Sequence, residues 1–303
     1  MVYTITFNPA LDYVMNVKSL RTDDINRTES EELYYGGKGI NVSVILSRLG
    51  IDNTAMGFLA GFTGKRLKQM LVKDGISCDF NYLEDGYTRI NVKIKADTEI
   101  DVNANGPDVK AEDIKALMSK LDEIKSGDYL VLSGSIPKSL PDDIYQRIME
   151  KLTDRGVRFV VDAEKDLLLN SLKYKPFLIK PNHHELGDIF NVKIDSDEDI
   201  IKYAKALQEQ GAVNVLVSMA KDGAMLIDEN SNVHKIENAP GKVVNSVGCG
   251  DSMVAGFVAG YIDKNDYDYA LRLGAACGNA TAFSKELALY DEIKAVFNKY
   301  YSI

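Results

Sequence analysis

The sequence predicts an α/β fold, with a mostly parallel sheet covered by helices on both faces and a small exposed sheet beside it. Two observations carry this prediction. From residue 108 onward, continuous apolar runs alternate with helix-like segments, which is typical of parallel strands buried on both faces. Residues 13–35 and 87–104 carry many charges and alternate in polarity, so they predict strands outside the core. The chain has 303 residues, 45% of them hydrophobic, and we expect a single domain over 1–303.

The first elements follow from apolar spacing. Residues 2–7 form an apolar run that predicts a buried strand, and a polar cluster follows it directly. Apolar positions over 40–49 recur at helical intervals, and Gly50 predicts the end of that helix. By the same criteria, residues 54–59 predict a strand and residues 63–74 a helix.

Residues 87–95 alternate strictly between apolar and polar side chains. Ile90, Val92 and Ile94 fall on one face, and the other face carries Arg89, Asn91, Lys93 and Lys95. This pattern predicts a half-buried strand with a cationic face, and residues 100–103 are expected to pair back onto it. The cationic face is a candidate for binding an anionic ligand. An edge strand kept soluble by lysines is an alternative that fits equally well.

The second half of the chain alternates strands and helices. The predicted strands are 129–132, 158–161, 177–179 and 214–217, and the predicted helices are 111–125, 142–155, 197–210, 252–259, 267–284 and 287–299. Each of the four strands ends in small, polar or turn residues. The carboxyl ends of parallel strands are where open α/β sheets hold ligands, so a site is expected at that edge.

The composition excludes several classes of protein. A net charge of −9 argues against a nucleic-acid surface, which needs a basic patch. No apolar run approaches the length of about 20 residues that a membrane helix requires, and no signal peptide opens the chain. The three cysteines, Cys78, Cys249 and Cys277, are widely spaced and show no zinc pattern. We therefore expect free thiols and a cytoplasmic protein.

The run Gly248-Cys249-Gly250-Asp251 precedes the apolar helix predicted from residue 252. A glycine-rich turn that leads into a helix N-terminus offers free N–H groups and a positive dipole end to an anion. Asp251 would repel that anion, which points to a base or metal ligand beside a transferring phosphoryl group. An ordinary N-cap aspartate in a glycine turn is the alternative.

Other candidate residues lie at strand ends and turns. Asp12 could bind sugar hydroxyls or be a loop aspartate in a turn, and Lys38, among three glycines, could hold a phosphate or be a solvated surface lysine. Asn182 and Glu185 could hold a hydrated Mg²⁺, whereas the adjacent His183 and His184 are not expected to bind metal. Asn279 could line a nucleotide pocket or allow close helix packing.

The chain resembles the ribokinase-like sugar kinases of the phosphofructokinase B branch over about residues 1–300. The resemblance rests on six motifs in matching order: Asn8-Pro9-Ala10-Leu11-Asp12, Gly36-Gly37-Lys38-Gly39-Ile40-Asn41, Thr88-Arg89-Ile90-Asn91-Val92-Lys93, Gly134-Ser135-Ile136-Pro137, Lys180-Pro181-Asn182 with Glu185, and Gly248-Cys249-Gly250-Asp251. Within this branch, the first and third motifs are most similar to kinases of fructose 1-phosphate. The resemblance implies a three-layer α/β/α domain and transfer of the γ-phosphoryl group of ATP to O6 of that sugar.

The resemblance also implies roles for individual residues. Asp251 is implied to be the base, with Gly248, Cys249 and Gly250 as the anion hole, and Glu185 is implied to hold Mg²⁺. The implied contacts with the sugar phosphate are Asp12, Gly37, Lys38, Asn41 and Arg89. The implied contacts with ATP are Lys180, Asn182, Ser218, Met219, Ala220, Lys221, Asp222, Gly223 and Asn279. The small sheet is implied to form a lid from about 13–35 and 87–104, shared in a homodimer. Phosphoryl transfer needs these parts: an anion hole, a metal, cations and a base.

The chain departs from the family pattern at two places. Cys249 stands where alanine is usual, and it could be a reactive thiol at a helix N-terminus or an inert small side chain. The glycine expected near residues 282–287 is not evident, so no adenine contact is assigned there. Three alternatives remain open: a tagatose-6-phosphate kinase, a ribokinase-type enzyme with a neutral substrate, and a non-catalytic sugar-phosphate sensor.

Overall fold

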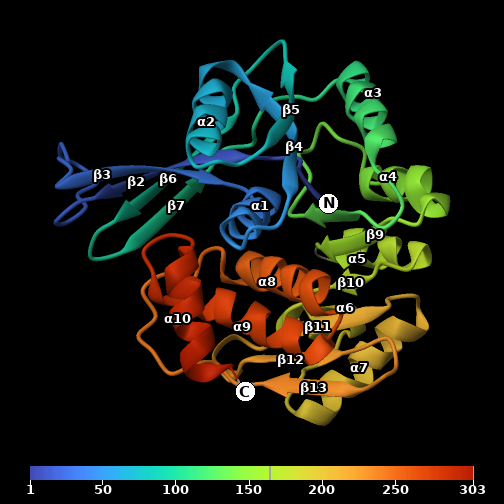
Figure 1. Cartoon of the computed structure of the whole chain (residues 1–303). Coiled ribbons are helices and arrows are strands. Elements are labelled where there is room, and N and C mark those ends of the chain that lie inside the picture. Colours follow the sequence, from blue (N-terminus) through green and yellow to red (C-terminus); the bar gives the residue numbers. More distant parts are fainter. Residues whose placement is uncertain (164, 303) are drawn as a thin grey trace.

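The computed structural model describes residues 1–163 and 165–302, and Figure 1 shows a layered body from which one small sheet projects. The strands of the large sheet are β1 (Val2–Thr6), β4 (Asn53–Ala60), β5 (Cys78–Leu83), β8 (Tyr129–Ser133), β9 (Arg158–Asp162), β10 (Leu178–Ile179), β11 (Asn214–Ser218), β12 (Ala224–Ile227) and β13 (Val233–Ile236). They lie in the order β13-β12-β11-β10-β9-β8-β1-β4-β5. All neighbours pair in parallel except β11-β12 and β12-β13. The predicted, mostly parallel sheet is confirmed.

Helices cover both faces of the large sheet. One face carries α1 (Lys38–Arg48), α2 (Gly61–Lys73), α8 (Cys249–Lys264), α9 (Tyr267–Phe283) and α10 (Tyr290–Tyr300), and the other carries α3 (Ala111–Lys120), α4 (Ile144–Leu152), α5 (Lys165–Ser171), α6 (His183–Phe190) and α7 (Asp197–Glu209). Strand β8 shows why, since Leu130 and Leu132 pack on one side and Tyr129 and Val131 on the other. Side chains of successive strand residues alternate between faces, so a continuous apolar run needs cover on both.

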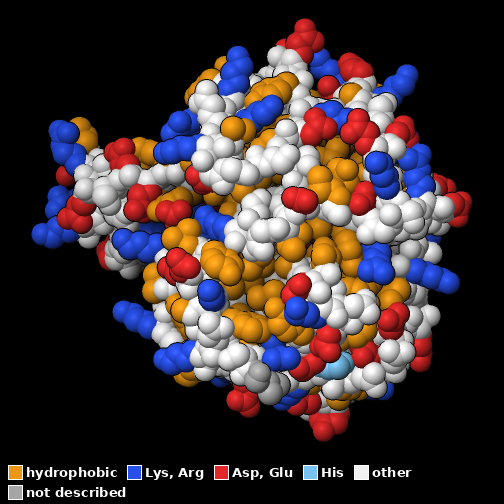
Figure 2. All heavy atoms as spheres, in the orientation of Figure 1, with side chains coloured by type: hydrophobic (Ala, Val, Ile, Leu, Met, Phe, Trp, Pro, Cys, Tyr) orange, Lys and Arg blue, Asp and Glu red, His pale blue; other side chains and the backbone are white. Residues whose placement is uncertain are grey.

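The small sheet, which we call the lid, consists of β2 (Ala10–Asn16), β3 (Ser30–Gly36), β6 (Arg89–Lys95) and β7 (Glu99–Asn103) in the order β3-β2-β6-β7. Figure 2 shows it as an arm that stands out from the body and carries many charged side chains. The predicted small sheet is thus confirmed, and β7 pairs antiparallel with β6 as expected. Asp12 lies inside β2, so its interpretation as a loop residue is wrong.

The structure shows which face of β6 meets the cleft. Ile90 is 39% exposed, whereas its neighbour Asn91 is only 7% exposed. The apolar face therefore points to solvent, and the polar face lies over the body, where Arg89, Lys93 and Lys95 line the main cleft. β6 lies between β2 and β7, so the edge-strand interpretation is also wrong.

Helix α8 is buried from Asp251 to Tyr261, as its apolar sequence predicts. It begins at Cys249, three residues before the predicted start. Among the described residues, no helix is both long and apolar enough to cross a bilayer.

Candidate functional site

A cleft of about 1230 Å³ lies between the lid, the carboxyl ends of the central strands and the start of α8. Its floor includes Thr6, Ser133 and Asp162, the last residues of β1, β8 and β9. From β1 the chain proceeds to β4 on one side and, later, to β8 on the other. That change of direction leaves a crevice at the carboxyl ends of the strands, which is where ligands bind in open α/β sheets.

The glycine turn before α8 has the geometry of an anion site. Gly248 caps the helix at φ 80°, a left-handed conformation that glycine adopts without strain. A methyl group at Gly250 would lie 3.3 Å from Nζ of Lys180, so this turn and a cation are in contact. The first N–H groups of α8 have no carbonyl partner within the helix. Because Gly248 is the cap, the interpretation of Asp251 as N-cap is wrong.

Asp251 lies in the first turn of α8 with 6% of its surface exposed. Asn41, on α1, donates a hydrogen bond from Nδ2 to Oδ2 of Asp251 at 2.8 Å. Burial, followed by the negative charge of Asp162, raises the pKa of Asp251 to about 6, against the lowering effect of Asn41, Lys38 and Lys180. A carboxylate with such a pKa is ionised at neutral pH and still basic enough to accept a proton from an alcohol as it reacts.

Asp162 brings two lysines together beneath this turn. Its Oδ1 lies 3.2 Å from Nζ of Lys180 and 3.6 Å from Nζ of Lys38. Burial alone would raise the pKa of Asp162, but the two lysine charges hold it below its ordinary value. Sequence reasoning missed Asp162 as a site residue, although it noted that a strand ends there. Lys38, expected at the sugar phosphate, lines the cleft beside Asp162, and its contact with a sugar phosphate stays a prediction.

The lid supplies the opposite wall of the cleft. Asp12 accepts a hydrogen bond from Nδ2 of Asn91 at 2.8 Å and lies 3.6 Å from Nζ of Lys93. A methyl group at Gly36 would lie 3.0 Å from Oδ2 of Asp12, so a larger side chain there would displace the carboxylate. Arg89 donates from Nε to the carbonyl of Asn8 at 3.1 Å and lines the same wall. Asp12 and Arg89 thus line the same wall, and their contact with a sugar phosphate stays a prediction.

Asn182 and Glu185 form a capping box at the start of α6. Oδ1 of Asn182 accepts from the N–H groups of His184 and Glu185, each at 2.9 Å, and Oε2 of Glu185 accepts from the N–H of Asn182 at 2.8 Å. Both side chains line the cleft. The described residues contain no group of three His, Cys, Asp or Glu side chains that could hold a metal ion.

The residues predicted to contact ATP fall into two groups. Ser218, at the end of β11, lines the cleft, and residues 219–223 turn the chain into β12. Asn279 is outside the cleft lining, and its Nδ2 donates to the Ala275 carbonyl at 2.7 Å and to Oη of Tyr301 at 3.0 Å. This arrangement fits close packing of α9, and the ATP contact of Asn279 stays a prediction.

The segment after α9 is a part of the site that sequence reasoning left unassigned. Lys285, Glu286 and Leu287 line the cleft, and Nη1 of Arg48 donates to the carbonyl of Ala288 at 3.0 Å. A methyl group at Gly248 would lie 2.6 Å from the Leu287 side chain, so this segment packs directly on the turn before α8. Its contacts with Arg48 and Gly248 are long-range in sequence, so no local pattern indicated it.

Cys249 is partly buried, and its Sγ lies 3.5 Å from the Asn245 carbonyl oxygen. Burial and the negative charge of Asp251 raise the pKa of this thiol to about 11. The structure therefore favours the inert interpretation over the reactive one. Cys78, Cys249 and Cys277 are all free thiols.

Comparisons with known proteins agree with this geometry. The family described as pfkB family carbohydrate kinase matches residues 5–292. A 1-phosphofructokinase of Bacillus subtilis is 45% identical over 95% of this chain and 94% of its own, and a D-tagatose-1-phosphate kinase of Bacillus licheniformis is 40% identical over 95% and 94%. The structure of phosphofructokinase-2 from Escherichia coli in complex with fructose-6-phosphate superposes with a TM-score of 0.91 at 26% identity, covering 99% of both chains. The chain belongs to the pfkB family of carbohydrate kinases.

Proposed function

We propose that the chain is an ATP-dependent 1-phosphofructokinase, which converts fructose 1-phosphate and ATP to fructose 1,6-bisphosphate and ADP. The observation that carries the proposal is Asp251, a buried carboxylate at the glycine-rich start of α8, within a chain 45% identical to a 1-phosphofructokinase. A base beside an anion site is the arrangement that phosphoryl transfer to a sugar hydroxyl requires.

In this proposal Asp251 accepts the proton of the 6-hydroxyl as that oxygen bonds to the γ-phosphorus of ATP. The bond from the γ-phosphorus to the β,γ-bridging oxygen breaks, and ADP leaves with the electron pair. The N–H groups at Gly248, Cys249 and Gly250 stabilise the charge on the transferring group, because they are fixed before the reaction begins. Asn41 holds Asp251 in place through its 2.8 Å hydrogen bond.

The sugar phosphate is proposed to lie under the lid. Asp12 and Asn41 bind sugar hydroxyls, while Gly37 allows close approach and Arg89 binds the phosphate on C1. Arg89 suits this role because a guanidinium can bind phosphate oxygens in a bidentate way. ATP would occupy the side formed by Lys180, Asn182 and residues 218–223. The lid would exclude water, which could otherwise accept the phosphoryl group.

Magnesium is proposed to arrive with ATP. The cap at α6 uses one oxygen of Glu185, and the other is left for a hydrated ion. Mg²⁺ commonly keeps several waters and binds through one or two carboxylates together with substrate phosphates. The carboxylate of Glu185 therefore fits the ion, which would neutralise charge on the phosphates of ATP.

Turnover with a panel of acceptors tests the function. The purified chain should consume ATP fastest with fructose 1-phosphate, followed by tagatose 1-phosphate, fructose 6-phosphate, tagatose 6-phosphate and fructose. Preference for tagatose 1-phosphate would favour the activity named for the B. licheniformis relative. Preference for unphosphorylated fructose would exclude the role of Arg89, and turnover with none of them would favour a non-catalytic sensor.

The lid also supports a proposed homodimer. Its outward face carries Ile90 at 39% exposed, Ile100 at 37% and Val102 at 57%, all from adjacent strands β6 and β7. Contiguous exposed apolar side chains mark association surfaces. Sedimentation should give a dimer for the wild type and a monomer for Val102→Lys, whereas Ile262→Lys, at a 40% exposed position on α8, should stay dimeric. A wild-type monomer at micromolar concentration would exclude the dimer.

A further inference from the structure

The buried acid Asp162 has no part in the proton transfer described above, yet it lies at the centre of the cleft. Its side chain is 3% exposed, and it contacts Lys38 from α1 and Lys180 from the segment after β10. One carboxylate oxygen is shared by both ammonium groups, while Oδ2 has no hydrogen-bond partner among the described residues. A buried carboxylate without partners is unfavourable, and its contacts with two cations offset that cost. The position of this group at the centre of the cleft needs an explanation.

The positions of the two lysines supply one. Nζ of Lys180 lies beside Gly250 in the turn before α8. The stem of Lys38 lies over Gly134, directly after β8, with Cβ and Cγ 3.7 Å from where a methyl group at Gly134 would be. Both ammonium groups lie against Oδ1 of Asp162, and both charges act on Asp251, beside which the transferring phosphoryl group is proposed to lie.

Lysine is a flexible point charge, and fixing its side chain in one rotamer costs conformational entropy. Two ammonium groups placed side by side also repel each other. A carboxylate between them removes both difficulties, because it attracts each lysine and cancels part of their repulsion. With Asp251 and Asp162 ionised, these four groups carry two negative and two positive charges.

We propose that Asp162 is a positioning residue that holds Lys38 and Lys180 on either side of the transferring phosphoryl group. It acts through the two lysines and does not touch the sugar. The proposal rests on the kinase function above and adds to it a division of the cations: Lys38 and Lys180 serve the transferring group, and Arg89 serves the substrate phosphate. It is an alternative to the expectation that Lys38 binds the sugar phosphate.

The division predicts how Asp162→Asn differs from wild type. Asparagine has the same shape without the charge, so both lysines lose their shared partner. We expect kcat to fall by about 10²-fold, as misplaced reacting or stabilising groups do, while the KM for fructose 1-phosphate changes little. Asp162→Glu keeps the charge and should recover part of the lost kcat.

A pH profile gives a readout that a merely structural role would not move. The groups that face Asp251 are Asn41 and Lys38 from α1, Asp162 from β9, Lys180 from after β10 and Cys249 from its own helix. Removing the charge of Asp162 leaves the lysines to favour the ionised form of Asp251. The acid limb of kcat should therefore move to lower pH in Asp162→Asn.

The control is Asp122→Asn. Asp122 also contacts two cations, with Oδ1 at 2.8 Å from Nζ of Lys151 and 2.9 Å from Nη2 of Arg155, but its side chain is 52% exposed and outside the cleft lining. This variant should match wild type in kcat and pH profile. Cooperative thermal unfolding of Asp162→Asn would show that it folds.

Three results would overturn the proposal. A kcat for Asp162→Asn within about threefold of wild type would show that the lysines do not need the carboxylate, since a positioned group typically contributes more. Restoration of kcat by excess Mg²⁺ would make Asp162 a metal ligand. If Asp162→Asn does not fold, Lys38→Met and Lys180→Met are measured instead. An unchanged kcat in both would show that the two lysines do not act in phosphoryl transfer. Each comparison uses the best acceptor of the wild type, so failure of the function itself would be seen first.

Discussion

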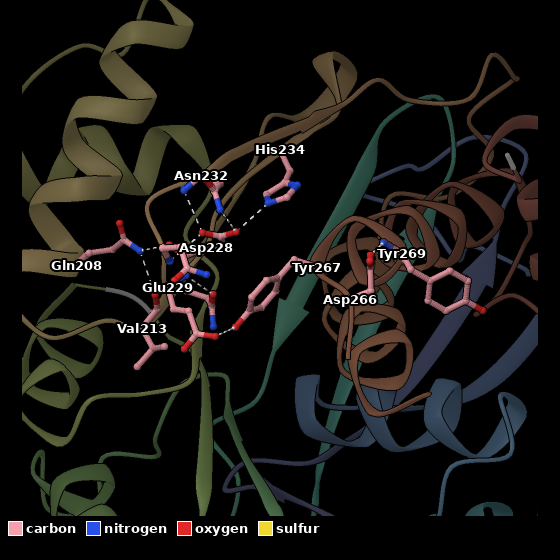
Figure 3. Close-up of polar contacts among 11 residues, drawn as sticks. Gln208, Val213, Asp228, Glu229, Asn232, His234, Asp266, Tyr267 and Tyr269 are labelled. Carbon is pink, nitrogen blue, oxygen red and sulfur yellow. Dashed lines mark hydrogen bonds and ion pairs between the residues drawn. The ribbon is translucent and has the colours of Figure 1, made fainter. Parts of the chain in front are cut away.

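Two buried aspartates in this chain have different surroundings. Asp228 and Asp162 are each 2% exposed, and each follows or ends a strand of the large sheet. Asp228 lies in the turn between β12 and β13, where Oδ1 accepts from the N–H groups of Asn230 and Asn232, each at 2.9 Å. Figure 3 shows Asp228 with Asn232 and His234 around it. Its Oδ2 accepts from Nδ2 of Asn232 and faces Nε2 of His234, each at 3.0 Å.

The difference lies in where the partners come from. The neighbours of Asp228 come from its own turn and the next strand, and they occupy both oxygens. Asp162 is contacted by lysines from two remote segments and keeps one oxygen without a partner among the described residues. An acid with hydrogen bonds to both oxygens stabilises its turn, whereas a buried acid that holds cations from remote segments at a cleft is arranged for a ligand. The comparison predicts opposite outcomes for substitutions in the two regions.

The largest effect is expected at Asp251. Asp251→Asn should bind ATP but lose about 10²–10⁴-fold in kcat, because a general base contributes that much. Initial rates with saturating fructose 1-phosphate measure this. Activity within about threefold of wild type would exclude Asp251 as the base.

The same variant should be more stable than wild type at pH 8. The pKa of Asp251 in the folded state, about 6, is above the ordinary value of 3.8, so its ionisation destabilises the native state. This loss of stability grows as pH rises between the two values and is complete above them. Asparagine removes this effect and can still accept the Asn41 hydrogen bond. Denaturant unfolding should show a gain of about 1–3 kcal/mol at pH 8 that disappears near pH 4. Lower stability than wild type at pH 8 would contradict the comparison.

Asp228→Asn should give the reverse result. Burial alone would raise the pKa of Asp228, but hydrogen bonds from His234 and Asn232 lower it below its ordinary value. The ionised form therefore stabilises the fold above the ordinary pKa, and this contribution is lost as pH falls through the lower, folded value. An amide group among four donors leaves at least one unsatisfied, which costs about 1–3 kcal/mol. We expect a lower free energy of unfolding at pH 7 with unchanged kcat, and a lowered kcat would mean that this turn influences the cleft.

Much of this contrast could not be predicted from the sequence. The parallel strands and the turn at Gly248 depend on local patterns, and both were predictable. Asp162 gave no signal because its partners come from an earlier helix and a later loop. The alternation of side chains in β6 predicted two faces but not which of them is exposed to solvent. That depends on the position of the cleft, which lies against the polar face. Short elements such as β12, β13 and α6 have too few residues for a clear period.

A smaller effect is expected at Arg89, which is proposed to bind the substrate phosphate while Lys38 and Lys180 serve the transferring group. Arg89→Ala should raise the KM for fructose 1-phosphate by about 10–100-fold, the range of one or two charge-assisted hydrogen bonds, and leave the KM for ATP nearly unchanged. Lys110→Ala is the control, since Lys110 is half exposed, pairs with Asp85 and is outside the cleft lining. A larger change in the KM for ATP would place Arg89 on the nucleotide side.

The smallest effect is expected at Cys249. Its position at a helix N-terminus predicts a reactive thiol, whereas its surroundings predict an unreactive one. It lies at the start of α8, where the helix dipole favours a thiolate, but burial and Asp251 raise its pKa to about 11. At pH 8 only about one thiol in 10³ would then be ionised, so iodoacetamide should label the native enzyme slowly and leave its activity intact. Cys249→Ala should keep wild-type activity, because the proposed anion hole uses backbone N–H groups. Peptide mapping after unfolding provides the control, since Cys78, Cys249 and Cys277 should all be labelled there. Rapid native labelling of Cys249 that ATP slows would show instead that the anion site activates its thiol, as the dipole alone would predict.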